Sequence, residues 1–143
     1  MTVPVPFTGG CDCGAIRYEG SAAPIAVLNC HCRNCQRSSG TGFTTVAVVP
    51  TDSLRLLRGT PRQHTSTADS GNEVKREFCP DCGTPLFARG GIPSQLMAIK
   101  VGSLDDPSWC VPTLDIWTQS AQPWTTMNPA LPKFPKNIPA PPH

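Results

Sequence analysis

The sequence contains no run of 18 apolar residues, which is about the shortest length for a helix that crosses a bilayer. Its first ten residues have neither a basic stretch nor a long apolar stretch, so we expect no secretory signal. Residues that build apolar cores are also scarce, since Leu, Ile, Val and Phe together number 29 of 143. That share is low for a chain that folds by apolar burial alone. We therefore expect one small domain that has a further source of stability.

Charge of either sign is sparse as well. Lysine and arginine number 12 and the acidic residues 10, which gives a formal net charge of +2. The arginines are scattered along the chain and form no basic stripe. Such a chain has little electrostatic attraction to nucleic acids or to anionic membranes, so the sequence predicts neither as a partner.

Proline (17 residues) and glycine (12 residues) are frequent, and both interrupt helices. Short segments rich in β-branched and apolar residues lie between turn residues, a pattern typical of strands. We expect strands at residues 15–19, 25–29, 43–49, 54–58, 63–67, 74–78, 85–89, 96–101 and 113–118. One short helix is expected at 34–39, ended by Gly40. The predicted fold class is mainly β, with short antiparallel strands and at most one short helix.

Cysteine is the residue type in excess, with eight in the chain. Seven of them lie in three clusters, at 11–13, 30–35 and 79–82, and Cys110 stands alone. Without a secretory signal we expect a cytoplasmic protein, in which disulfides rarely persist and thiols at this density usually bind metal. Metal crosslinks would also supply stability that the small apolar core lacks.

The third cluster, Cys79-Pro80-Asp81-Cys82-Gly83, has the pattern of a zinc knuckle. Two thiolates converge on one metal, and a glycine follows where the backbone turns tightly. A structural zinc needs four ligands, and Cys11 and Cys13, again followed by glycine, offer the other two. The sequence thus predicts a structural zinc site of these four thiols. The alternatives are a redox-active pair in the third cluster and iron in place of zinc.

The second cluster holds three thiols, Cys30, Cys32 and Cys35, within six residues. Three protein ligands leave one position of a tetrahedral zinc open, which is the catalytic arrangement. His31 is a fourth ligand, a proton shuttle, or a side chain that points away from the metal, because neighbours in an extended segment face opposite sides. Cys110 and a distant carboxylate are further candidates for the fourth ligand.

A zinc ion held by three thiolates is a weak Lewis acid, and its soft ligands favour an incoming thiol as the fourth ligand. This site therefore indicates thiol chemistry on a small molecule. Arg33 and Arg37 follow in sequence and either pair with a substrate carboxylate or lie on a solvated face. Cys110 is a ligand, a nucleophile or a small buried residue. Trp109 and Trp117 either line a pocket or pack in the core.

Three segments resemble the glutathione-dependent formaldehyde-activating enzyme family, which also includes the domain of centromere protein V. They are Gly9–Tyr18, Cys30–Gly40 and Phe78–Leu86. Shorter segments near Trp117, Trp124 and Phe134 extend the resemblance over about residues 8–135 of a single domain spanning 1–143. About residues 136–143 remain as a Pro-rich tail. The resemblance implies a small zinc-stapled, β-tent-like fold.

The same resemblance implies two Zn²⁺ ions, a structural one on Cys11, Cys13, Cys79 and Cys82 and a catalytic one on Cys30, Cys32 and Cys35. We expect the second site to be partly empty in a purified sample, because an open three-thiolate site is easily oxidised or stripped.

The activity that the resemblance implies is that of a carbon–sulfur lyase, which in reverse joins glutathione and formaldehyde to S-(hydroxymethyl)glutathione. Its partners would be a small thiol such as glutathione and a small aldehyde. His31, Arg33 and Arg37 are candidates to assist the zinc-bound cysteines, while Gln36 stands where the family often has a second basic residue. The alternatives are a non-catalytic zinc-binding interaction module and a different thiol or carbonyl enzyme on the same scaffold.

Overall fold

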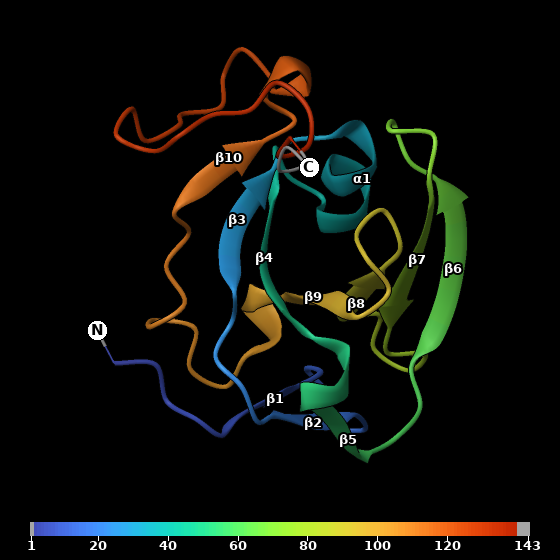
Figure 1. The fold of residues 1–143 in the computed structure, drawn as a ribbon. Coiled ribbons are helices and arrows are strands. Elements are labelled where there is room, and N and C mark those ends of the chain that lie inside the picture. Colours follow the sequence, from blue (N-terminus) through green and yellow to red (C-terminus); the bar gives the residue numbers. More distant parts are fainter. Residues whose placement is uncertain (1, 140–143) are drawn as a thin grey trace.

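The computed structural model describes residues 2–139. That part of the chain forms ten β-strands, one α-helix and three short 3-10 helices (Figure 1). The strands are β1 (Phe7–Gly10), β2 (Arg17–Gly20), β3 (Ala26–Cys30), β4 (Thr44–Pro50), β5 (Leu54–Arg58), β6 (Arg62–Thr67), β7 (Glu73–Phe78), β8 (Pro85–Arg89), β9 (Leu96–Lys100) and β10 (Leu114–Ile116). The helix α1 is Arg33–Ser39, and the 3-10 helices are Thr51–Ser53, Val101–Ser103 and Thr118–Ser120. The predicted mainly β fold with one short helix is confirmed.

Every expected strand is present with small shifts at its ends, and α1 ends as expected at Gly40, whose φ is 73°. Strand β1 was missed because half of it is glycine, a residue depleted in strands. Its partner strand shows why small residues are needed. A Cβ atom on Gly9 would lie 2.3 Å from the Tyr18 hydroxyl oxygen, and one on Gly20 would lie 2.1 Å from the Phe7 ring.

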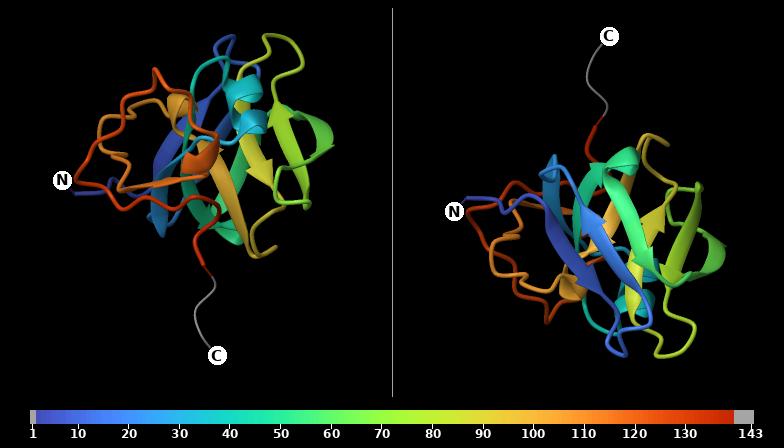
Figure 2. Two further views of the ribbon diagram at one scale, coloured as in Figure 1. Left: turned by 90° about the horizontal axis from the view of Figure 1, so that it is seen from above. Right: turned by 90° about the horizontal axis from the view of Figure 1, so that it is seen from below.

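The strands form two sheets. A three-stranded sheet has the order β1-β2-β5, and a seven-stranded sheet has the order β10-β3-β4-β9-β8-β7-β6. In Figure 1 the small sheet lies below the large one, which curves so that β10 and β6 stand on opposite sides of α1. Figure 2 shows the same arrangement from above and below. One strand pair corrects the expectation of antiparallel strands, since β10 runs parallel to β3.

Two apolar clusters hold the fold together. The larger contains Tyr18 and Phe87, whose rings meet edge to face with centroids 5.0 Å apart. The smaller contains Leu28, Val46 and Val48 together with the three cysteines of the second cluster. Side chains alternate along β9, so Met97 and Ile99 belong to the larger cluster and Ala98 to the smaller. The smaller cluster thus packs around the cysteines of the second group.

The segment after β10 packs back on that strand. The Phe134 N–H donates to the Asp115 carbonyl, and the Trp117 N–H donates to the Lys136 carbonyl, each at 3.0 Å. The expected Pro-rich tail therefore has its first residues in contact with the domain, while residues 140–143 lie outside the described range. No helix in the described range is both long and apolar enough to cross a bilayer.

Candidate functional site

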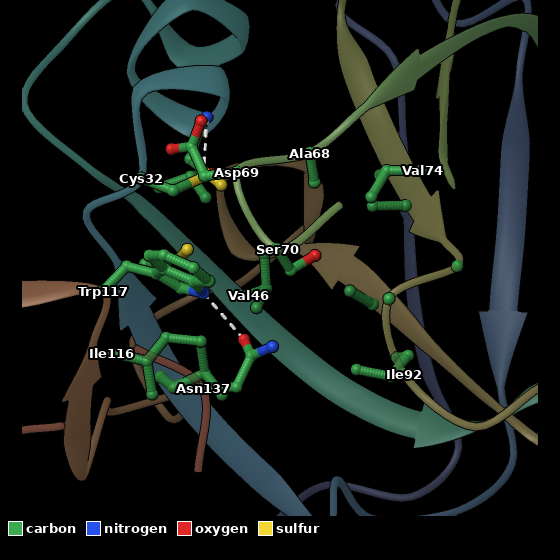
Figure 3. A pocket seen from close by; sticks show the side chains of 18 of the residues that line it. Cys32, Val46, Ala68, Asp69, Ser70, Val74, Ile92, Ile116, Trp117 and Asn137 are labelled. Atoms are coloured by element: carbon green, nitrogen blue, oxygen red, sulfur yellow. Dashed lines mark hydrogen bonds between the residues drawn. The ribbon is translucent and has the colours of Figure 1, made fainter. Parts of the chain in front are cut away.

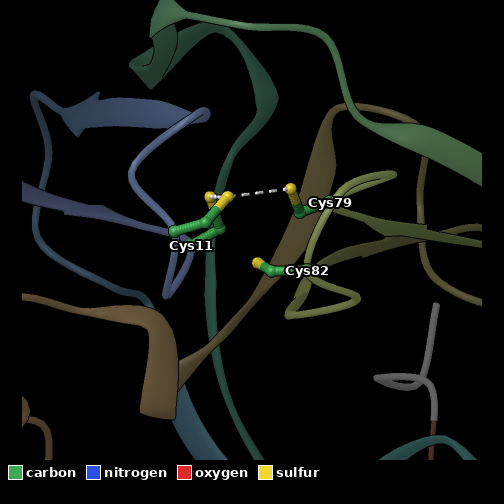
Figure 4. Close-up of side chains that lie close together, drawn as sticks. Cys11, Cys79 and Cys82 are labelled. Carbon is green, nitrogen blue, oxygen red and sulfur yellow. Dashed lines mark hydrogen bonds between the residues drawn. The ribbon is translucent and has the colours of Figure 1, made fainter.

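Four cysteines from two turns face one another. Cys11 and Cys13 lie between β1 and β2, and Cys79 and Cys82 lie between β7 and β8 (Figure 4). Their four sulfur atoms lie within 4.8 Å of one another. The Sγ atoms of Cys11 and Cys13 are 3.6 Å apart, and those of Cys13 and Cys79 are 3.8 Å apart. Four sulfurs around one tetrahedral zinc at 2.3 Å would be about 3.8 Å apart, so the group has the size of such a site.

The two turns have the same local construction. Gly14 and Gly83 both have a φ of 79°, a conformation that favours glycine. Their N–H groups donate to the carbonyls of Cys11 at 3.1 Å and Cys79 at 2.9 Å, which closes each turn. In the first turn the Ile16 N–H also donates to the Cys11 sulfur at 3.2 Å. This construction holds the sulfurs toward a common centre and fits them for a metal cation.

Hydrogen bonds around the knuckle favour a thiolate. The side chain and the backbone of Thr84 donate to the Cys82 sulfur and lower the pKa of the Cys82 thiol to about 6. The Thr84 Oγ1 atom lies 3.1 Å from that sulfur. A metal ligand must be deprotonated, so this environment prepares Cys82 for metal binding at neutral pH.

The second group consists of Cys30, Cys32 and Cys35, whose sulfurs also lie within 4.8 Å of one another. Cys30 ends β3, Cys32 is the N-cap of α1, and Cys35 lies in the first turn of that helix. The Cys32 sulfur accepts a hydrogen bond from the Cys35 N–H at 3.2 Å. All three residues are buried. The strand end and the helix start thus bring the three thiols together over six residues.

Two basic side chains lie close to this group. An Nη2 atom of Arg76 on β7 lies 3.9 Å from the Cys35 sulfur. The buried Lys100 on β9 donates from Nζ to the Thr44 hydroxyl at 3.2 Å. Hydrogen bonds from Cys30 and Cys32, together with the charges of Lys100 and Arg76, lower the pKa of the Cys35 thiol. Positive charge beside Cys35 therefore favours the deprotonated form of that thiol, which a metal requires. The neighbouring thiols and burial raise the pKa of Cys30.

Sequence reasoning missed both Arg76 and Lys100. Burial lowers the pKa of the Lys100 ammonium. The Thr44 hydroxyl can accept from only one of its three N–H donors. A lysine that follows four apolar residues in a strand was the signal that could have found it. Arg76 gave no such signal, because its strand is mostly polar.

His31 points away from the three sulfurs. Its Nε2 atom lies 2.8 Å from a carboxylate oxygen of Asp115, and both side chains are only 1% exposed. Its ring also packs against Phe43, with centroids 5.3 Å apart. Of the three roles considered for His31, the geometry matches the one in which it faces away and forms an ordinary hydrogen bond. That bond ties the segment between β3 and α1 to β10.

Arg33 and Arg37 are exposed and line a hollow beside Trp124. Arg33 also lines a second hollow, beside Asp69 and Trp117. The Arg33 guanidinium donates to the side-chain oxygen of Gln36. Gln36 itself is buried, and its amide nitrogen donates to the carbonyls of His31 at 2.8 Å and Ser120 at 3.0 Å. A glutamine is therefore used here to join α1 to the C-terminal part of the chain.

A pocket of about 130 Å³ adjoins the three thiols (Figure 3). Its walls are mainly aliphatic and come from β3, β4, β8, β9 and β10. They include Leu28, Val46, Val48, Ala88, Ala98 and Ile116. Arg76 and Lys100 line it too, and Ala68, Asp69, Ser70 and Ile92 contribute from loops. The structure thus brings together three thiols, two cations and the aliphatic part of the pocket, which we call the apolar chamber.

Trp117 lines the pocket and also packs in the smaller apolar cluster, so both of the placements considered for it are present. It has a φ of 57°, a left-handed conformation that costs about 1–3 kcal/mol in a residue other than glycine. Its indole N–H donates to the Asn137 side-chain oxygen at 2.7 Å (Figure 3). Trp109 instead packs on Phe7, with ring centroids 5.3 Å apart. The C-terminal segment therefore helps to build the pocket.

Cys110 belongs to neither cysteine group in the described part of the chain. It is 3% exposed, and burial raises the pKa of its thiol to about 11. A thiol with this pKa is protonated at neutral pH and is a poor nucleophile. Its environment matches a small buried residue.

A sequence model of the glutathione-dependent formaldehyde-activating enzyme matches residues 6–120. The chain belongs to this family. A protein of Phaeosphaeria nodorum whose name assigns it to the same family is 33% identical over 88 residues, which are 58% of this chain and 45% of that protein. A similarly named protein of Talaromyces marneffei is 28% identical over 88 residues, covering 58% of this chain and 46% of its own length. The chain thus spans about half the length of these relatives.

A solved structure has a similar fold. The crystal structure of a Rhodobacter sphaeroides protein superimposes with a TM-score of 0.56 at 22% identity and covers 68% of this chain and 87% of that one. The matched region of the family, residues 6–120, contains all seven clustered cysteines as well as Arg76, Lys100 and Trp117. Asn137 lies beyond it.

Proposed function

We propose that the chain binds two zinc ions. Cys11, Cys13, Cys79 and Cys82 would hold a structural ion, and the group of Cys30, Cys32 and Cys35 a catalytic one. The short sulfur–sulfur distances and the N–H groups that donate to sulfur support both assignments. Four thiolates complete a tetrahedral zinc, whereas three leave a position for a substrate. The two ions would therefore have different tasks within one domain spanning residues 1–143.

On this basis the chain is a carbon–sulfur lyase that catalyses the reversible addition of a thiol such as glutathione to a small aldehyde. The observation that carries the proposal is that the three-thiol group lines a pocket which also contains two cations. Membership of the family supports the same chemistry. In the forward direction a sulfur–carbon bond forms and the thiol proton ends on the carbonyl oxygen. The reverse reaction breaks that bond and releases thiol and aldehyde.

Zinc bound at the three thiols would lower the pKa of a coordinated substrate thiol and so supply a thiolate at neutral pH. The residues of the chain act on the aldehyde. Negative charge develops on the carbonyl oxygen as the new bond forms. The Lys100 ammonium would donate a hydrogen bond to that oxygen and stabilise its charge. The positive charge of Arg76, which lies beside the Cys35 sulfur, offsets the negative charge of the thiolates. The aliphatic walls exclude water and strengthen both interactions.

Exchange NMR on glutathione and formaldehyde tests this function. With the zinc-loaded protein we expect interconversion of free thiol and adduct to be about 100-fold faster than in buffer, because acid–base assistance alone supplies that much. Metal content is measured on the same sample. Exchange at the background rate with two zinc ions per chain would contradict catalysis and favour an interaction module instead.

Replacing Lys100 with methionine is expected to return the exchange to about the rate in buffer, because loss of one preorganised donor costs about 100-fold in other enzymes. Methionine keeps the length and apolar stem of the side chain, so two zinc ions should remain bound. Lys75→Met, at an exposed position on β7, is the matched control and should behave as the parent. Parent-like rates in K100M would show that the ammonium takes no part in the reaction.

A further inference from the structure

The walls of the pocket are more apolar than formaldehyde requires. Formaldehyde is one carbon and one oxygen, so it has no side group to bury. Beyond the cysteines and cations, however, the pocket continues between Leu28, Val46 and Val48 on β3 and β4. These side chains belong to the smaller apolar cluster and are less than a tenth exposed. A ligand that reaches them gains free energy only through apolar groups.

Two small residues create this space. Ala88 on β8 lies directly opposite Ala98 on β9 in the strand register, and both line the pocket. Larger apolar side chains at this pair would fill the chamber, as Phe87 and Ile99 fill the neighbouring register position on the opposite side of the sheet. The chamber is therefore a consequence of residue size at one register position.

The volume indicates what fits. An apolar cavity of about 150 Å³ in another protein takes up benzene, and the pocket here has about 130 Å³. A branched alkyl group of about four carbons or a small ring is thus accommodated, whereas the whole glutathione molecule is not. Glutathione also carries two carboxylates, which would lose hydration without partners on the aliphatic walls.

A polar hollow next to the pocket suits the thiol. It shares Asp69, Ser70, Trp117 and Asn137 with the pocket, so the two are contiguous. Arg33 and Lys136 line this hollow and can pair with carboxylates. A peptide-like thiol would therefore lie in the hollow, and the apolar chamber is left for the other reactant.

We propose that the aldehyde substrate carries a short aliphatic or aromatic group that occupies the chamber between Ala88, Ala98 and Trp117. This inference rests on the proposed function and narrows its substrate class. The reaction is RCHO plus R′SH giving R′S–CH(OH)R. The sulfur–carbon bond forms, the thiol proton passes to the carbonyl oxygen, and nothing is oxidised or reduced.

The test compares formaldehyde, propanal, 2-methylpropanal and 3-methylbutanal in glutathione exchange by NMR. Each rate is divided by the uncatalysed rate for the same aldehyde, which removes differences in intrinsic reactivity. We expect this acceleration to rise about fourfold for each added carbon that is buried. In Ala88→Leu the ratio of the 3-methylbutanal acceleration to that of formaldehyde should fall at least about tenfold. Ala88→Val is the milder variant should the leucine prevent folding.

Ala23→Leu, at an exposed position outside the pocket, is the matched control and should keep the parent's ratio. A second readout is the indole N–H signal of Trp117 in a ¹H–¹⁵N spectrum, titrated with the unreactive probe 3-methyl-1-butanol. We expect it to shift in the parent and not in A88L. Acceleration confined to formaldehyde would overturn this inference and leave the proposed function intact. No acceleration with any aldehyde would overturn both.

Discussion

Replacing Cys32 with serine is expected to abolish catalysed exchange between glutathione and formaldehyde and to remove one of two bound zinc ions, while the fold survives. The reason is that Cys32 has two separable tasks. Its sulfur caps α1 by accepting from the Cys35 N–H, and a serine hydroxyl caps a helix at least as well. A neutral hydroxyl is, however, a poor replacement for a thiolate on zinc. The variant thus removes metal binding by Cys32 while it keeps the capping of α1.

Three measurements check this prediction. Metal analysis should fall from two zinc ions per chain to one, circular dichroism should keep the parent's spectrum, and exchange NMR should give the uncatalysed rate. Cys110→Ala is the matched control, because Cys110 is a buried cysteine outside both groups, and it should keep both ions and the parent's rate. Catalysed exchange in a C32S sample that holds a single zinc would place the chemistry elsewhere.

Replacing Cys79 with serine is expected to unfold most of the protein at 25 °C. Cys79 is fully buried, and its group joins the β1–β2 turn to the β7–β8 turn, which lie about 65 residues apart in the chain. A structural zinc site contributes about 10–16 kcal/mol of apparent binding free energy at pH 7. A whole domain of this kind is stable by only about 5–15 kcal/mol. Loss of this ion therefore removes about as much free energy as the whole free energy of unfolding of the domain.

Circular dichroism and the dispersion of a ¹H–¹⁵N spectrum measure the outcome for C79S. Asp81→Asn changes an exposed residue of the same turn and should leave both spectra unchanged. Titrating the parent with a chelator gives a second route, since withdrawal of both ions should produce the same unfolding transition. A folded C79S protein with the parent's melting temperature would mean that the apolar core alone sustains the fold.

Local spacing explains what could be predicted about the site. Thiols two or three residues apart lie within a few ångströms of one another in almost any turn, so the three-thiol group and each half of the four-thiol group follow from local spacing. That the two halves belong together was predicted from the four ligands that a structural zinc needs, and it is the fold that brings the β1–β2 and β7–β8 turns face to face. The turn glycines, Gly14 and Gly83, are local in the same sense. The strands were predictable where β-branched residues are dense, as in β4. Strand β1 was not, because its glycines are required by contacts with β2 that no local pattern reveals.

The sequence by itself thus determined the mainly β class, the helix ended by Gly40 and the two sets of thiols. Only the tertiary structure decided what surrounds the second set. Arg76, Lys100, Trp117 and Asn137 reach it from β7, β9, the end of β10 and the C-terminal segment, and the strand order that assembles them mixes near and distant segments. The parallel direction of β10 and the hydrogen bond between His31 and Asp115 depend on the same packing. Such juxtapositions arise from the burial of faces against one another, which is a property of the whole chain and not of any window of sequence.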